Sequence, residues 1–194
     1  MAMPEQELNR KYTYKEYVTW DGRWELIEGI PYNMSPAPVS KHQDILLSLA
    51  TEFKVYLRNK KCRVYVAPYD IRLLVEQEND EDTMNVVQPD ISIICDPKKI
   101  DKKGCKGSPD LVVEILSPAT AKKDRGSKFK LYERAGVKEY WIIDPSNDTL
   151  EEYKLQDDKY GSAKVYGVQD SIKVDMFEDL TIDLKPVFET MEDQ

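Results

Sequence analysis

The sequence predicts a mixed α/β (α+β) fold in which helices cover a central β-sheet. One observation is an apolar stripe that predicts a helix starting at residue 40, and another is an almost wholly apolar run at residues 110–117. A strand without polar alternation is typical of the middle of a sheet that is covered on both faces. Around these two elements the apolar pattern gives the order helix, three strands, helix, strand, with further strands at both ends.

The N-terminal part is expected to form a short helix and a hairpin. Residues 13–18 fit one short helix, and residues 23–34 fit two short strands that turn at Glu28-Gly29. The segment SPAP at residues 35–38 then breaks the pattern with two prolines.

The helix that follows is expected to be the clearest in the chain. Ser40 and Gln43 have the spacing of a capping box, which predicts the helix start. Apolar residues then recur at three- and four-residue steps, at Ile45, Leu46, Leu49, Phe53, Tyr56 and Leu57. The helix therefore buries one face against the sheet.

Runs of aliphatic, β-branched and aromatic residues predict four strands, at residues 63–75, 86–95, 110–117 and 139–144. An acidic loop at residues 76–82 joins the first two. A second helix is expected after Ser117 and stops at Gly136, a residue type that favours helix ends. Weaker strands are expected in the acidic C-terminal part, at about residues 146–187. We expect the core to span about residues 40–145.

Length and composition fit one globular domain over residues 1–194. The chain is 41% hydrophobic and 33% charged, which is a globular composition. It contains no run of 18 apolar residues, and residues 1–7 lack the basic start and apolar core of a signal peptide. We therefore expect a cytoplasmic protein that does not contact a membrane.

The cysteine and histidine content restricts the possible metal chemistry. The three cysteines, Cys62, Cys95 and Cys105, form no CxxC pair, so free thiols are expected in place of a disulfide framework or a zinc site. The single histidine, His42, excludes sites that need two imidazoles. A divalent cation would then need oxygen ligands, which suits Mg²⁺ or Mn²⁺.

Two carboxylates stand where the strand pattern expects apolar residues. Glu114 interrupts the apolar run 110–117, and Asp90 follows Pro89 inside an apolar stretch. Burying a carboxylate costs several kcal/mol unless a partner compensates it. The pair could hold one divalent cation, or each carboxylate could meet an Arg or Lys in a buried ion pair.

The second helix offers a candidate cation for these carboxylates. Asp124, Lys128 and Tyr132 are spaced by four residues and share one helix face. Lys128 could point back toward Glu114. The alternative is an ordinary surface pair between Asp124 and Lys128, which is worth a few tenths of a kcal/mol.

Charge is unevenly distributed along the chain. The net charge is −8, but residues 98–134 contain eleven Lys/Arg against five Asp/Glu, and residues 144–194 contain fourteen acids against five bases. This basic segment is a candidate footprint for a polyanion. The alternative is a solvated lysine-rich loop.

Together these residues resemble the PD-(D/E)XK nuclease signature, because Glu114 follows Pro89-Asp90 after a spacer of 23 residues. The fuller pattern is similar to the restriction-endonuclease family called Uma2 (Uma-two). The matching stretches are ELIEGIPYNMSPAP, the helix with His42, APYDIRL, VVQPDISII, PDLVVEILSPAT, DRGSK and AGVKEYWIIDP. The resemblance implies a restriction-endonuclease-like core of order αβββαβ with a mixed central sheet, an N-terminal hairpin and extra C-terminal strands.

The resemblance also implies a site and an activity. Asp90, Glu114 and the carbonyl of Ile115 would bind Mg²⁺ or Mn²⁺, and the chain would be an endonuclease that hydrolyses DNA with a metal-activated water. The superfamily lysine two residues after the glutamate is replaced here by Leu116. Lys128 matches the migrated lysine of this branch, and Lys130 is the second choice.

Four further residues are candidates for supporting roles: Glu28, His42, Asp70 and Asp124. His42 lies on the apolar side of its helix, so an ordinary histidine at the edge of the core is the alternative. Trp20, Trp24 and Trp141 could be core or rim residues, or platforms on which bases stack. Two alternatives to the nuclease stay open: a catalytically inactive module that binds nucleic acid or protein, and a subunit that forms a homodimer through the acidic C-terminal part.

Overall fold

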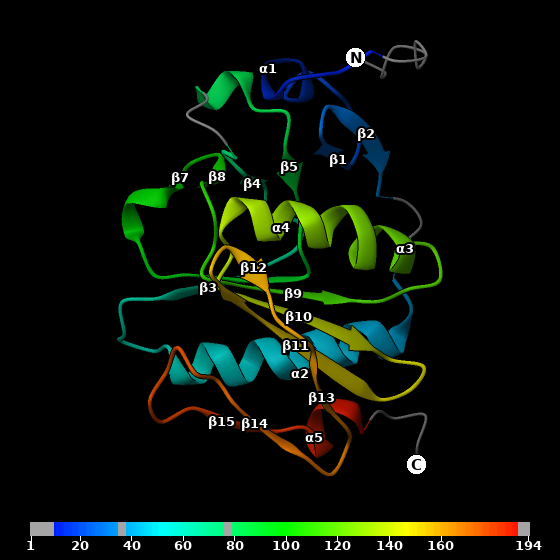
Figure 1. The fold of residues 1–194 in the computed structure, drawn as a ribbon, viewed down its shortest axis with the longest axis vertical. Coiled ribbons are helices and arrows are strands. Elements are labelled where there is room, and N and C mark those ends of the chain that lie inside the picture. Colours follow the sequence, from blue (N-terminus) through cyan, green and yellow to red (C-terminus); the bar gives the residue numbers. More distant parts are fainter. Residues whose placement is uncertain (1–9, 35–37, 76–78, 190–194) are drawn as a thin grey trace.

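A seven-stranded mixed sheet forms the centre of the computed structural model, which describes residues 10–34, 38–75 and 79–189 (Figure 1). Its strands are β3 (Arg63–Val66), β6 (Ile91–Ile94), β9 (Leu111–Ile115), β10 (Glu139–Asp144), β11 (Thr149–Gln156), β12 (Lys159–Tyr160) and β13 (Lys164–Tyr166). The order is β12-β11-β10-β9-β6-β3, with β13 paired to β11. Only β9 and β10 of these strands run parallel, and the helical crossover between them makes that possible.

Helices cover both faces of this sheet (Figure 1). On one face lies α2 (Ser40–Tyr56), whose Ile45, Leu49 and Phe53 are fully buried as the apolar stripe predicts. On the other face lie α3 (Ala121–Lys123), a π-helical segment (Asp124–Lys128) and α4 (Phe129–Ala135), which ends at the left-handed Gly136. Strand β9 alternates between the two layers: Leu111, Val113 and Ile115 join the α2 core, and Val112 and Leu116 join the α4 core. Glu114 therefore points to the α4 side.

A second sheet lies beyond α4, toward the top of Figure 1. It contains β1 (Trp24–Ile27), β2 (Ile30–Asn33), β4 (Ile71–Arg72), β5 (Val86–Val87), β7 (Ile100–Asp101) and β8 (Gly104–Lys106), in the order β2-β1-β5-β4-β8-β7. The short helix α1 (Tyr14–Tyr17) lies at the same end. The remaining turns of 3₁₀ helix are Asp80–Asp82 and Pro97–Lys99. Arg72 is fully buried in this sheet and pairs with Asp80 at 2.7 Å and Asp101 at 2.6 Å.

Two expected strands are each divided between the sheets, which corrects the prediction. Residues 63–75 form β3 in the large sheet and β4 in the small one, and residues 86–95 form β5 and β6 in the same way. The breaks fall at Pro68 and Pro89, which lack the N–H that a ladder needs. The chain thus crosses twice between the sheets, and Asp90 stands at one of the crossings.

Two local predictions are wrong. The expected capping box at Ser40 does not form, because Val39 is the N-cap and Ser40 is already the first helical residue. Cys62 and Cys95 form a disulfide, so the expectation of three free thiols holds only for the buried Cys105. The antiparallel register of β3 and β6 pairs Arg63 with Ile94 and so places the two cysteines opposite each other.

The C-terminal part adds a small layer below α2, formed by β14 (Ser171–Lys173), β15 (Thr181–Asp183) and α5 (Lys185–Phe188). Val187 and Phe188 of α5 join the α2 core. The segments 1–9, 35–37, 76–78 and 190–194 lie outside the described residues. The prediction that residues 1–7 form no signal peptide, most of the predicted break at residues 35–38 and part of the predicted acidic loop at 76–82 fall in these segments. Within the described ranges, no helix combines the length and apolar character needed to cross a bilayer.

Candidate functional site

A cleft of about 1720 Å³ lies where the C-terminal end of β9, the start of α2 and the α3–α4 segment meet. Asp90, Glu114, Ile115 and Lys128 all line it, so the residues predicted from separate parts of the sequence share one cleft. This is the candidate active site.

Asp90 is fixed by the crossing between the two sheets. The register of β6 and β9 pairs Ile91 with Val113, which places residue 90 beside the end of β9. Asp90 Oδ2 accepts a hydrogen bond from the Ile115 N–H at 2.8 Å and lies 3.3 Å from Nε2 of His42. His42 is 6% exposed and contacts the candidate metal ligand, so the structure brings it to the site edge.

Glu114 is almost fully buried on the α4 side of β9. Its Oε1 accepts hydrogen bonds from Lys128 Nζ at 2.8 Å and from the Tyr132 hydroxyl at 2.7 Å. Burial, together with the nearby carboxylates of Asp124, Asp90 and Glu25, raises the pKa of Glu114 to about 8 despite the attraction of Lys128. The cost of burying the charged form of Glu114 therefore outweighs the attraction of the Lys128 ammonium.

Lys128 ends the π-helical segment, whose wider turns commonly mark functional sites. Its side chain is 2% exposed and lies among three carboxylates, at 2.8 Å from Glu114, 2.6 Å from Glu25 and 3.7 Å from Asp124. Burial acts to lower the pKa of Lys128, but Glu114, Glu25 and Asp124 raise it well above its usual value. Lys128 is therefore a fixed positive charge at neutral pH. The alternative of a surface Asp124–Lys128 pair is wrong, because Asp124 is also buried.

Glu25 on β1 is the site residue that the sequence reasoning missed. It is fully buried, and its Oε1 contacts Lys128 Nζ at 2.6 Å and accepts the Gln88 N–H at 2.9 Å. Its Oε2 accepts a hydrogen bond from Lys123 Nζ at 2.6 Å. Burial acts to raise the pKa of Glu25, but Lys128 and Lys123 lower it below the usual value. The signal available in the sequence was its place in the matching stretch ELIEGIPYNMSPAP.

The donor set fits a hard divalent cation such as Mg²⁺ or Mn²⁺. Asp90 Oδ1 and Glu114 Oε2 accept no hydrogen bond from any residue that the structure describes. The described part of the chain contains no cluster of three or more His, Cys, Asp or Glu side chains suited to a metal. Mg²⁺, however, commonly uses one or two protein carboxylates together with water and substrate phosphates.

The formal charge of the site supports this fit. The site contains four carboxylates, the buried Glu25, Glu114 and Asp124 and the partly exposed Asp90, and two ammonium groups, those of Lys123 and Lys128. With all four carboxylates ionised, the site has a formal excess of two negative charges, which one divalent cation would neutralise. Because the pKa of Glu114 is raised to about 8, such a cation would displace its proton on binding.

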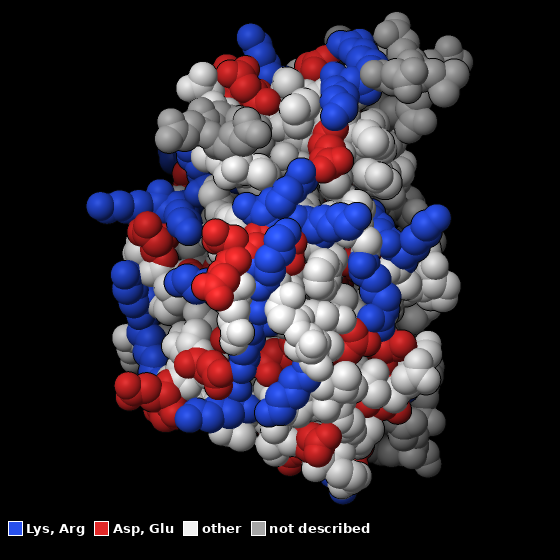
Figure 2. Space-filling model, in the orientation of Figure 1, with Lys and Arg blue, Asp and Glu red and all other residues white. Residues whose placement is uncertain are grey.

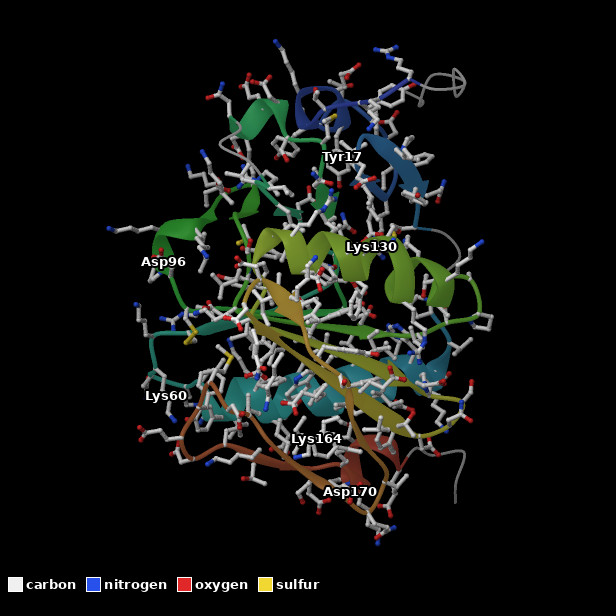
Figure 3. The ribbon with its side chains drawn as sticks, in the orientation of Figure 1. Tyr17, Lys60, Asp96, Lys130, Lys164 and Asp170 are labelled. Atoms are coloured by element: carbon white, nitrogen blue, oxygen red, sulfur yellow. A yellow bond between two sulfur atoms is a disulfide. The ribbon has the colours of Figure 1, made fainter. Side chains whose placement is uncertain are left out.

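The remaining predicted residues lie at the rim or outside the cleft. Glu28 lines the rim and pairs with Arg134 at 2.6 Å on the exposed surface. Asp70 does not line the cleft; its Oδ1 accepts hydrogen bonds from Tyr17 and Gln88. Lys130 on α4, labelled in Figure 3, lines the cleft. The amine that contacts Glu114, however, is that of Lys128.

The basic segment 98–134 divides between two places. Its lysines at 122, 123, 128 and 130 line the cleft, whereas those at 98–106 do not. Figure 2 shows Lys and Arg interspersed with Asp and Glu over the visible face, and no continuous basic surface. The lysines that could contact a polyanion in the cleft are therefore those at residues 122–130, and the predicted footprint does not extend over the whole segment 98–134.

Comparisons with known proteins agree with this architecture. The family model of Uma2, described as "Putative restriction endonuclease", matches residues 13–185. An "Uncharacterized protein slr1290" of Synechocystis sp. (strain ATCC 27184 / PCC 6803 / Kazusa) is 30% identical over 155 residues, which are 76% of each chain. The crystal structure of "a putative nuclease belonging to DUF820" from Anabaena variabilis ATCC 29413 superposes with a TM-score of 0.72 at 20% identity, covering 91% of this chain and 97% of that one. The predicted fold class, a restriction-endonuclease-like core, is confirmed.

Proposed function

The chain belongs to the Uma2 family, and from that membership we propose that it is a metal-dependent endonuclease that hydrolyses DNA phosphodiester bonds. The observation that carries the proposal is the 2.8 Å contact between Lys128 Nζ and Glu114 Oε1, in a cleft that Asp90 also lines. Leu116 occupies the strand position where the signature has lysine, and the helix lysine supplies the missing ammonium.

Asp90, Glu114 and the Ile115 carbonyl would hold Mg²⁺ or Mn²⁺. Such an ion, when bound, lowers the pKa of a water molecule and neutralises a phosphate oxygen. The hydrogen bond from the Ile115 N–H fixes one oxygen of Asp90 and leaves Oδ1 for this role. Tyr132 and Lys128 fix Oε1 of Glu114 in the same way and leave Oε2.

Lys128 acts as a positive charge and hydrogen-bond donor and not as a general base. Its pKa lies well above the usual value, so it keeps its proton at neutral pH. An ammonium held among carboxylates is positioned to orient the attacking water and to stabilise negative charge that develops on the phosphate. Lys123 and Lys130 on the cleft wall would contact neighbouring phosphates of the strand.

The test compares cleavage of supercoiled plasmid and of single-stranded DNA with Mg²⁺, with Mn²⁺ and with chelator. We expect metal-dependent cleavage by the wild type and at least a hundredfold loss in Asp90→Asn, Glu114→Gln and Lys128→Met. Glu28→Gln is the matched control, because Glu28 lines the same cleft but makes its ion pair on the exposed surface. Thermal unfolding confirms that each variant is folded.

Two results would contradict the proposal. Equal cleavage by wild type and the Asp90 and Glu114 variants would assign the activity to a contaminant. DNA binding without cleavage, together with no Mn²⁺ binding by calorimetry, would instead support a catalytically inactive binding module.

A further inference from the structure

A second, smaller pocket of about 370 Å³ shares Gln88 with the cleft, and four of its nine lining residues are aromatic. We call it the aromatic pocket; Tyr17 of α1, Trp20 and Trp24 form one side, and Asp70 and Gln88 form the polar side. Trp20 is half-buried, and its ring lies 5.6 Å from that of Tyr17 and 6.1 Å from that of Trp24. Figure 3 labels Tyr17 at the end of the molecule that carries α1.

The polar side of the aromatic pocket is rigidly built but keeps one acceptor free. Asp70 Oδ1 accepts hydrogen bonds from the Tyr17 hydroxyl at 2.9 Å and from Gln88 Nε2 at 2.8 Å. Asp70 Oδ2 accepts no hydrogen bond within the described ranges. A carboxylate oxygen in this situation is an acceptor for an N–H group of a ligand.

Gln88 connects the aromatic pocket to the cleft. It lines both, and its Oε1 accepts a hydrogen bond from Arg23, which also lines the cleft. Its backbone N–H donates to Glu25, which holds Lys128, and Asp90 follows two residues later. A strand bound in the cleft would therefore run close to a residue that also forms the wall of the pocket.

We propose that the aromatic pocket binds one unstacked nucleobase that carries an exocyclic amino group, such as cytosine. The volume lies within the range of small-ligand pockets, aromatic rings stack bases, and carboxylates accept hydrogen bonds from the cytosine amino group. This inference rests on the proposed function, because it names the substrate class of the same cleft: DNA with an unpaired base. The half-buried Trp20 and Trp24 then serve as stacking surfaces at the pocket.

The test measures binding in chelator, so that no cleavage occurs. The probes are short, dye-labelled, abasic single strands that carry one central base, either cytosine or uracil, and fluorescence anisotropy gives the dissociation constants. We expect the wild type to bind the cytosine strand about tenfold more tightly. Asp70→Asn replaces the free acceptor by an amide that can donate, so it should reverse the preference toward uracil, whose O4 is an acceptor.

Further variants separate stacking from folding. Trp20→Ala should weaken binding of the cytosine strand by about 5- to 150-fold, the range for losing one stacked base, and Trp20→Phe should restore most of it. Tyr56→Ala is the matched control, since Tyr56 is an aromatic residue of α2 that lines neither the pocket nor the cleft. Thermal unfolding shows which variants are folded.

The outcomes distinguish this inference from the nuclease proposal. If the ratio of the dissociation constants for the cytosine and uracil strands is the same for the wild type and Asp70→Asn, the pocket does not bind the base through Asp70. This inference is then wrong whether or not the protein cleaves DNA. If the ranking reverses but no metal-dependent cleavage is found, the base pocket stands and the endonuclease proposal is wrong. Unchanged binding by a folded Trp20→Ala would also overturn the inference.

Discussion

Lys128 Nζ lies 2.6 Å from Glu25 Oε1, so a residue of the N-terminal hairpin holds the helix lysine in place. Glu114 contacts the same ammonium from the central sheet at 2.8 Å. The candidate site is therefore completed by a strand outside the αβββαβ core. Glu25 is a positioning residue in this arrangement, because it acts through Lys128.

Replacing Glu25 by Gln keeps the shape and the hydrogen bond from Gln88, but it removes the charge that attracts Lys128 and the oxygen that accepts from Lys123. We expect kcat for DNA cleavage to fall by about 10- to 100-fold, the range seen when supporting contacts of catalytic groups are removed, with a smaller change in KM. The measurement is steady-state cleavage of a fluorescent oligonucleotide. Glu28→Gln on the same hairpin is the control, and kcat should stay within about twofold of wild type. A change in KM with kcat unaltered would contradict the positioning role.

The migrated lysine can be tested by moving it back to the strand. Leu116 lines the cleft and packs in the α4-side core, on the same face of the strand as Glu114. Lys128→Met should greatly lower the cleavage rate. Adding Leu116→Lys should raise the rate about tenfold above that of Lys128→Met alone, because an ammonium then returns to the site. Leu116→Met in the same background controls for the change in packing. No recovery by a folded double variant would show that the two positions do not substitute for each other in space.

A helix or strand could be predicted from the sequence where its pattern of apolar residues is typical of only one kind of element. Phe53 and Leu49 mark the buried face of α2, and the apolar run around Glu114 marks a central strand. The division of residues 63–75 and 86–95 between two sheets was not predictable, because the apolar pattern continues across both breaks and only the prolines hint at them. The Cys62–Cys95 bond depends on the register of β3 and β6, which separate segments of sequence do not reveal.

The site divides in the same way. Asp90 and Glu114 stand out because a charged residue interrupts an apolar strand. Glu25 does not stand out, since a glutamate between Trp24 and Leu26 fits the polar face of an ordinary hairpin. Its burial follows from contacts with Lys123 and Lys128, about a hundred residues away along the chain. Such a partner becomes visible only once the two sheets are assembled.

Two glycines should respond to alanine in opposite directions. Gly104 has φ +122°, and a Cβ there would lie 2.1 Å from the Asp70 carbonyl oxygen. Gly104→Ala should therefore lower the free energy of unfolding by about 2–4 kcal/mol, because both strain and a clash with backbone are introduced. At Gly126 in the π-helical segment, a Cβ would meet no neighbouring group within 4 Å. Gly126→Ala should raise stability by roughly 0.5–1 kcal/mol. Urea unfolding measures both free energies of unfolding. A change of the same sign and size in the two variants would contradict the different roles given to Gly104 and Gly126.

Glu139 on β10 gives the fold a pH dependence that is separate from the cleft. Burial and, to a smaller extent, the neighbouring Glu152 raise the pKa of Glu139 to about 7 despite Lys154. Its Oε2 is buried and has no hydrogen-bond partner among the described residues. An acid whose pKa is raised on folding favours the protonated folded state, so its contribution is complete below its usual pKa of 4.5 and is lost as the pH rises through 7.

Glu139→Gln mimics the protonated form at every pH. The variant should match the wild type below about pH 4.5 and exceed it in free energy of unfolding above pH 7, by up to roughly 3 kcal/mol. The measurement is urea unfolding at several pH values between 4 and 8.5, read as the difference between the two proteins so that other titrating groups cancel. Glu52→Gln is the control, because Glu52 is exposed on α2 and should give a difference that does not change with pH. A difference between Glu139→Gln and wild type that is flat over this range would show that folding does not change the pKa of Glu139.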